Sequence, residues 1–157
     1  MTKPLVVEQS RTIPMGQAAV FRDMVPMPLP DLFGKWYGPI PPIKETRDQT
    51  GDWDAVGQSR TVVLVGGGSM REELTQFDAP HSFGYTLSDV TGPLSPLVDH
   101  VEGVWLFEPI GNGTEVTWRW TIHPRSALTA PLLPVFGWLW KGYARQSLAE
   151  LSRQLVH

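Results

Sequence analysis

The 157-residue sequence contains no cysteine, so disulfide bonds, thiolate nucleophiles and zinc–thiolate sites are excluded. It also lacks an apolar run of about 18 residues, the length that a transmembrane helix needs. Its most apolar stretch, residues 127–140, is interrupted by Pro131 and Pro134. The N-terminal residues are partly charged and do not form the apolar core of a signal peptide. We therefore expect a cytoplasmic protein without a transmembrane segment.

Charged residues are scarce as well, at 18% of the chain, and the net charge is -3. Without a basic surplus the protein has little with which to neutralise phosphates, so we expect no nucleic-acid partner. Hydrophobic residues make up 41%, a proportion typical of globular proteins. The length suits one domain with one core, and we expect a single domain over residues 1–157.

Motifs for catalysis or metal binding are equally few. The four histidines show no sequence spacing typical of metal ligands, so we expect neither a metal site nor another cofactor. Strand alternation places His100 and His123 on the face opposite the apolar one. Histidines on such an outer face are usually solvated. The glycines at 66–68 lack the Lys-Ser/Thr of a phosphate-binding loop and predict a hairpin turn instead. The sequence identifies no catalytic residue.

What the sequence does contain is a succession of strand-like segments followed by one long amphipathic helix. The expected strands are residues 5–13, 43–49, 58–65, 69–77, 81–88, 98–109 and 114–123. Apolar residues recur every 3.6 positions over residues 134–156, and a short helix is expected at 17–24. This order predicts an α+β fold in which a curved antiparallel sheet of six to seven strands grips the C-terminal helix, with short helices after the first strand.

Residues 24–43 form an unusual connection that holds six of the 15 prolines. Proline removes a backbone donor and fixes φ, so at most a single helical turn is expected, near residues 31–34. The segment nevertheless carries large apolar side chains, including Phe33, Trp36 and Tyr37. We interpret it as a lid or a bridge across one end of the sheet.

The alternation of each strand also predicts which side chains face inward. A curled sheet that grips a helix leaves space between the two, and three indoles on its inner face favour pocket walls over plain core. Plain core is the alternative, because buried aromatic side chains also fill tight interiors. The predicted ligand-binding residues are Arg60, Val62, Glu72, Leu74, Tyr85, Leu87, Trp105, Phe107, Trp118, Trp120, Trp140 and Tyr143.

Two of these residues are charged. The same parity places Arg60 and Glu72 inward on either side of the glycine hairpin. Buried charges persist only when they are paired, because removing each ion from water costs several kcal/mol. The two side chains are therefore either a structural ion pair or the polar contacts of an apolar pocket, unless a one-residue bulge turns one of them outward.

Several short motifs carry a family resemblance. They are Val56-Gly57 with Arg60-Thr61-Val62, then Arg71-Glu72-Glu73-Leu74, Gly103-Val104-Trp105-Leu106-Phe107 and Gly113-Thr114-Glu115-Val116-Thr117-Trp118. With the order of the elements, they resemble the START-like (SRPBCC, helix-grip) superfamily, and within it the polyketide cyclase/dehydrase and lipid-transport group. The resemblance covers nearly the whole chain and implies a ligand cavity between the sheet and the C-terminal helix.

Three functional hypotheses follow. The first is binding of a small hydrophobic molecule, lipid-like or polyketide-like, and the second is a polyketide cyclase or aromatase acting on a ligand in the same cavity. The third is a weak membrane-surface or partner contact through Leu132, Leu133, Val135, Trp138 and Leu139, unless residues 26–42 bury this patch. Trp138 lies off the apolar face of the helix, so we expect it to pack on residues 26–42 or on the second subunit of a homodimer.

Overall fold

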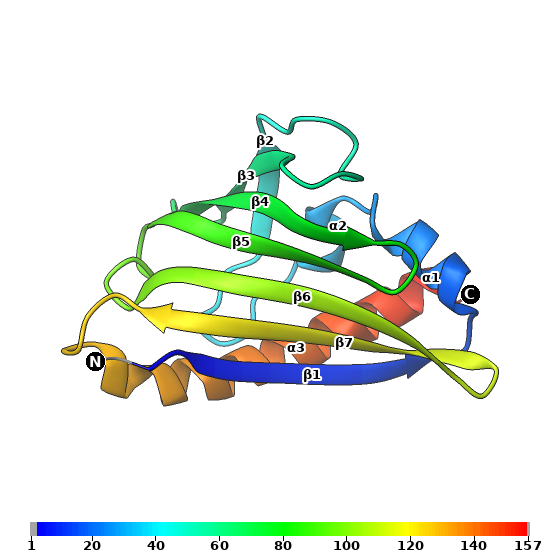
Figure 1. The fold of residues 1–157 in the computed structure, drawn as a ribbon. Coiled ribbons are helices and arrows are strands. Elements are labelled where there is room, and N and C mark those ends of the chain that lie inside the picture. Colours follow the sequence, from blue (N-terminus) through cyan, green and yellow to red (C-terminus); the bar gives the residue numbers. More distant parts are fainter. Residues whose placement is uncertain (1–2, 157) are drawn as a thin grey trace.

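A computed structural model describes residues 3–156 of the protein. Seven strands form one antiparallel sheet in the order β1-β7-β6-β5-β4-β3-β2 (Figure 1). The strands are β1 (Leu5–Ile13), β2 (Ile43–Arg47), β3 (Ser59–Leu64), β4 (Ser69–Asp78), β5 (Ser82–Thr91), β6 (Val98–Ile110) and β7 (Gly113–Pro124). The helices are α1 (Gln17–Met24), α2 (Leu29–Leu32), the single 3-10 turn η1 (Ala130–Leu132) and α3 (Leu133–Leu155).

The sheet curves around α3, as the sequence predicts. Strands β2 to β7 pair in chain order, and β1 pairs with β7 and forms the edge of the sheet opposite β2. In Figure 1, α3 runs behind β1 and β7 along their length, while α1 lies near the end of the sheet where α3 finishes. The expected α+β fold with a long C-terminal helix and short helices after the first strand is confirmed.

Several element boundaries differ from the sequence-based expectation, and two of these differences have a local cause. Strand β5 continues to Thr91 rather than ending at Ser88, because Asp89 takes a positive φ of 51° and the β4–β5 register shifts there. Such an irregularity lets a strand pass through a turn-like sequence without ending. The helical turn in the proline-rich connection covers Leu29–Leu32 rather than residues 31–34, since Pro30 fits the first turn of a helix.

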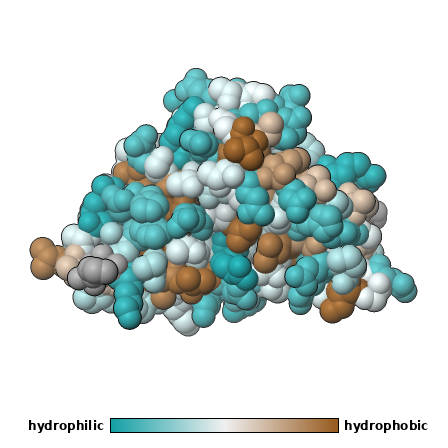
Figure 2. Space-filling view, viewed as in Figure 1, coloured by the Kyte–Doolittle hydropathy of each residue, from teal (hydrophilic) through white to brown (hydrophobic). Residues whose placement is uncertain are grey.

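The strand alternation separates a buried face from an accessible one. On β7, Val116, Trp118, Trp120 and Ile122 are buried, and the residues between them are partly exposed. In the orientation of Figure 1, Figure 2 shows a surface dominated by hydrophilic residues, with apolar residues in separate spots. Among the described residues, no helix is long and apolar enough to cross a membrane.

The start of α3 exposes several apolar side chains. Leu132, Val135 and Trp138 are all exposed, whereas Leu133 is buried. With 73% of its surface exposed, Trp138 does not pack on residues 26–42, so that expectation is wrong. The proline-rich connection instead meets the helix about one turn further along, where Gly142 faces Tyr37. Contact with a second subunit or with a membrane surface stays a prediction for this patch.

Candidate functional site

A pocket of about 380 Å³ lies between the inner face of the sheet, α3 and the proline-rich connection. This volume is within the range of small-molecule sites, roughly 300–1,000 Å³. The pocket is lined mainly by apolar and aromatic side chains from all three parts. The predicted residues that line it are Arg60, Val62, Glu72, Tyr85, Leu87, Trp105, Trp118, Trp120, Trp140 and Tyr143.

Two predicted residues do not line the pocket. Leu74 and Phe107 are both fully buried, and Phe107 lies toward the end of the sheet that α1 covers. There Phe21 of α1 packs edge-on against Phe107, with 5.1 Å between ring centroids, and the space is filled. Strand parity places both residues inside the fold, and the contact with α1 makes Phe107 part of the solid core.

The aromatic wall is held together by hydrogen bonds to one phenol. The Tyr85 hydroxyl accepts a hydrogen bond from the Nε1–H of Trp118 and another from that of Trp120, both at 2.8 Å. The indole of Trp118 also stacks on Trp105, with ring centroids 4.9 Å apart. Burial, together with the nearby Glu72 carboxyl, raises the pKa of the Tyr85 phenol, although the two indole donors act in the opposite direction. The phenol therefore stays protonated at neutral pH.

A glycine makes this arrangement possible. Tyr85, Gly103 and Trp120 lie side by side on β5, β6 and β7 as directly paired residues. A Cβ atom on Gly103 would lie 2.2 Å from the Tyr85 Cζ, so any side chain there would displace the ring. Without it, the Tyr85 ring lies across β6 and reaches both indoles of β7. The sequence places Gly103 on the inner face, but its role depends on the register of three strands.

The charged residues form a buried ion pair. Arg60 and Glu72 are directly paired on β3 and β4, and the Arg60 Nε–H donates to Glu72 Oε1 at 2.7 Å. Both are buried, with 7% and 5% of their surfaces exposed, so no bulge turns either outward. Burial raises the pKa of Glu72 above its usual range, and the Arg60 guanidinium opposes this shift.

The pair leaves polar groups available. Within the described residues, the Nε–H is the only Arg60 donor with a hydrogen-bond acceptor, and Glu72 Oε2 has no donor. The Arg60 guanidinium instead lies over the Trp53 ring, 3.9 Å from its centroid. Such a cation–π contact stabilises a buried cation without using its N–H groups. The pocket thus combines apolar walls with hydrogen-bonding groups of Arg60 and Glu72 that a ligand could contact.

Sequence reasoning missed Trp53 as a pocket residue. It lies in the connection between β2 and β3, has a positive φ of 61° and is 1% exposed. Its neighbours Asp52 and Asp54 and the preceding glycine are typical of a solvated turn, so alternation offers no inward direction for it. The one signal in the sequence is that a large aromatic residue occurs within an otherwise polar turn, where neither helix nor strand periodicity accounts for it.

The proline-rich connection forms part of the pocket wall. Phe33 packs against Trp118 and Tyr143, with ring centroids 5.1 Å and 5.9 Å apart. Side chains of α3 hold the backbone of the connection, because Gln154 donates to the Asp31 carbonyl oxygen at 2.7 Å and Gln146 donates to that of Lys35 at 3.4 Å. The lining residues that are also exposed, among them Trp36 and Pro93, mark the mouth of the pocket.

We expect Gly142→Ala to loosen this connection. A Cβ atom at position 142 would lie 2.0 Å from the Tyr37 hydroxyl oxygen and 2.1 Å from its Cζ, so the Tyr37 ring must move away. Limited proteolysis should then cut within residues 26–42 at least about fivefold faster than in the wild type, because local opening exposes the backbone. Gly16→Ala, where a Cβ meets no atom within 4 Å, is the control. Equal cleavage rates in both variants would contradict the proposed packing.

Comparison with known proteins agrees with the motifs and the fold. The profile of the family described as polyketide cyclase/dehydrase and lipid transport matches residues 4–156. The chain belongs to this family. Its fold is the START-like helix-grip fold, so the resemblance carried by the sequence motifs is confirmed. A search of curated proteins gives no match.

Solved structures of similar fold extend the comparison. Norcoclaurine synthase from Thalictrum flavum, in complex with dopamine and hydroxybenzaldehyde, has a TM-score of 0.73 at 15% identity, covering 99% of this chain and 88% of that one. Ginseng major latex-like protein 151 from Panax ginseng has a TM-score of 0.73 at 11% identity, covering 99% of each chain. Ara h 8.0201 has a TM-score of 0.66 at 17% identity, covering 98% of each chain. At these identities the similarity establishes the fold alone.

Proposed function

We propose that this polyketide cyclase/dehydrase and lipid-transport family member binds a small, largely apolar molecule that carries at least one hydrogen-bond-accepting oxygen. The observation that carries the proposal is the buried Arg60, which lines the pocket and has N–H donors that find no acceptor among the described residues. A ligand oxygen placed there would gain a charge-assisted hydrogen bond in a largely water-excluded site. In this carrier role, by which we mean ligand binding without catalysis, Arg60 would supply specificity through a polar contact in addition to hydrophobic burial of the ligand.

The aromatic wall supports an apolar ligand body. Trp105, Trp118 and Trp140 present flat faces, and Trp118 is held in place by Tyr85. Rigid aromatic surfaces bind planar or polycyclic ligands with little loss of side-chain entropy. The related fold of norcoclaurine synthase was solved with two small aromatic molecules, dopamine and hydroxybenzaldehyde. The ligand class that fits these features is an aromatic, polyketide-like or lipid-like molecule with a carbonyl, phenol or carboxylate group.

Fluorescent probes test both parts of this proposal. A neutral apolar probe (Nile red) and an anionic apolar probe (8-anilinonaphthalene-1-sulfonate) should each bind saturably and change tryptophan emission. Replacing Arg60 by Met should weaken the anionic probe at least about tenfold, since a hydrogen bond to a charged group contributes about 1.5–3 kcal/mol. The neutral probe should change by less than about threefold.

Arg71→Met is the matched control, because Arg71 lies on the same hairpin but bonds to Thr61 and Ser59. Near-UV circular dichroism must show both variants folded under the conditions of the titration. Absence of saturable binding of either probe, or equal effects of the two substitutions, would contradict the proposal. Native mass spectrometry of protein purified from its own host would then identify a retained ligand directly.

A cyclase- or aromatase-type enzyme is the second candidate, supported by one observation on Glu72. This carboxyl is buried, its pKa is raised, and its Oε2 has no hydrogen-bond donor among the described residues. A general acid or base needs such a group within reach of the ligand. If catalysis occurs, Glu72→Gln should abolish turnover of a cyclisable polyketone while probe binding is retained. The carrier role predicts no turnover in the wild type.

A further inference from the structure

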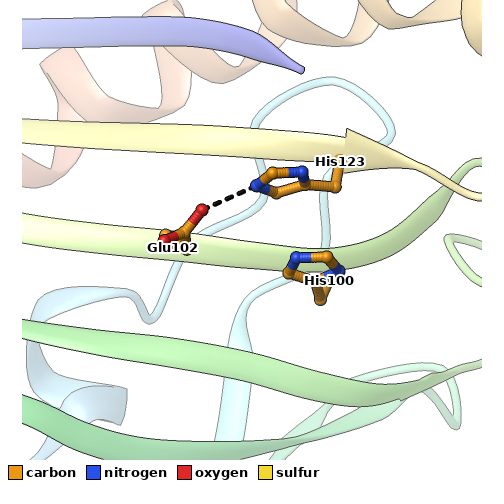
Figure 3. A group of neighbouring side chains, drawn as sticks. All are labelled: His100, Glu102 and His123. Atoms are coloured by element: carbon orange, nitrogen blue, oxygen red, sulfur yellow. Dashed lines mark hydrogen bonds and ion pairs between the residues drawn. The ribbon is translucent and has the colours of Figure 1, made fainter. Parts of the chain in front are cut away.

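A second group of chemically active side chains lies on the outer face of the sheet. His100 and Glu102 are two residues apart on β6, and His123 on β7 is the direct partner of His100 (Figure 3). His100 and Glu102 have the strand parity opposite to that of the buried Val101 and Gly103, and His123 has the parity opposite to that of the buried Ile122. They therefore lie outside the pocket and take no part in the proposed ligand binding.

The three side chains already converge. The His100 and His123 rings stack with centroids 4.0 Å apart and an interplanar angle of 11°. His123 Nε2 lies 2.6 Å from Glu102 Oε1, and one ligand atom from each of the three residues lies within 4.8 Å of the others. Zinc binds imidazole nitrogen and carboxylate oxygen at about 2.0–2.2 Å, which places tetrahedral ligands roughly 3.3 Å apart. Small side-chain rotations on an accessible surface are enough to reach that spacing.

A neighbouring carboxylate orients one of the imidazoles. Asp99 Oδ2 lies 2.7 Å from His100 Nδ1, and Arg125 holds the other Asp99 oxygen at 3.3 Å. A carboxylate on Nδ1 favours the tautomer with its proton there and leaves a lone pair on Nε2. This pattern of carboxylate, histidine and metal recurs around zinc ligands, where the carboxylate fixes the ring and makes it more basic.

We propose that His100, Glu102 and His123 bind one divalent transition-metal ion of the zinc type. Two imidazoles and one carboxylate suit zinc and its neighbours in the first transition row better than calcium or magnesium, which prefer oxygen ligands alone. Because the ligands come from β6 and β7, the ion would link these two strands. The site is distinct from the pocket, so it can be present whether or not the proposed ligand binding is correct.

Titration of tag-free full-length protein with Zn²⁺ tests the site. Isothermal calorimetry should show one site per chain, and saturating Zn²⁺ should raise the melting temperature of the wild type. His123→Gln and Glu102→Gln should each weaken Zn²⁺ binding at least about tenfold and abolish most of the thermal shift. With Co²⁺ as the probe, the visible absorption of a bound, low-symmetry ion should appear in the wild type and be lost in His123→Gln.

His81→Gln is the matched control, since His81 is an exposed histidine near Asp78 in the turn between β4 and β5, outside the cluster. It should bind Zn²⁺ as the wild type does. Both cluster variants replace accessible side chains, and circular dichroism without metal should confirm that they are folded. The proposal is overturned if no one-to-one binding occurs, if His123→Gln binds normally, or if His81→Gln loses binding. Each of those results would leave the cluster as two carboxylate-paired histidines only.

Discussion

Replacing Glu72 by glutamine is expected to lower the free energy of unfolding by about 3–5 kcal/mol, the usual cost of breaking a buried ion pair. The substitution removes the carboxylate that Arg60 contacts at 2.7 Å and leaves the guanidinium buried. Arginine cannot release its proton at accessible pH, so the stranded charge has no way to neutralise itself. Urea-induced unfolding followed by tryptophan fluorescence measures the loss.

Arg60→Met should behave differently, because the remaining partner can take up a proton. In the wild type, burial already raises the pKa of Glu72 above its ordinary value of 4.5, with Arg60 opposing the shift. Without Arg60 the folded-state pKa of Glu72 rises further. A carboxyl with a raised folded-state pKa binds more protons when folded than when unfolded, so stability is retained at low pH and lost as the pH rises from about 4.5 through that folded-state pKa. The decline approaches about 1.4 kcal/mol per pH unit.

The double substitution Arg60→Met with Glu72→Leu separates pairing from burial. Replacing both partners by apolar residues removes the stranded charge, so most of the stability lost in Glu72→Gln should return. The double-mutant cycle built from Arg60→Met, Glu72→Leu and the double variant should therefore show a coupling energy of at least about 2 kcal/mol. An unchanged stability for Glu72→Gln, or a pH-independent Arg60→Met variant, would show that the pair is hydrated and contributes little.

Removal of a single oxygen atom in Tyr85→Phe is the second change with a large expected effect. It leaves the buried Nε1–H groups of Trp118 and Trp120 without their common acceptor. Each stranded donor costs about 1–3 kcal/mol, so the free energy of unfolding should fall by about 2–6 kcal/mol. The indoles also lose the contact that fixes their orientation, and the affinity for the neutral apolar probe should decrease several-fold.

Tyr143→Phe provides the control. Tyr143 is also buried and lines the same pocket, but no hydrogen bond from its hydroxyl is present among the described residues. Removing the Tyr143 hydroxyl should change the free energy of unfolding by less than about 1 kcal/mol. Gly103→Ala should reproduce the Tyr85→Phe effect on probe binding, since a Cβ there displaces the Tyr85 ring. If Tyr85→Phe and Tyr143→Phe are equally mild, the two indole hydrogen bonds do not hold the wall in place.

The histidine cluster shows where sequence reasoning stops. Strand alternation correctly places His100 and His123 on the accessible face, but they are 23 positions apart in the sequence, a spacing that is not typical of metal ligands. Their contact depends on the register of β6 against β7, which shifts between Val98 and His100. A shift of one residue would pair His123 with a different neighbour on β6. Register is set by the turn and by packing of the whole inner face, so local sequence does not predict it.

The sequence by itself determined the succession of strands along the chain, the long C-terminal helix and the inward direction of Trp105, Trp118 and Trp120. These features follow from local periodicity, because a side chain on a strand or helix inherits its direction from its position. Only the tertiary structure decided which inward residues border the pocket and which are solid core. That outcome depends on how irregular segments fill the space, as Trp53 and the 26–42 connection do, and segments without periodicity carry no directional signal.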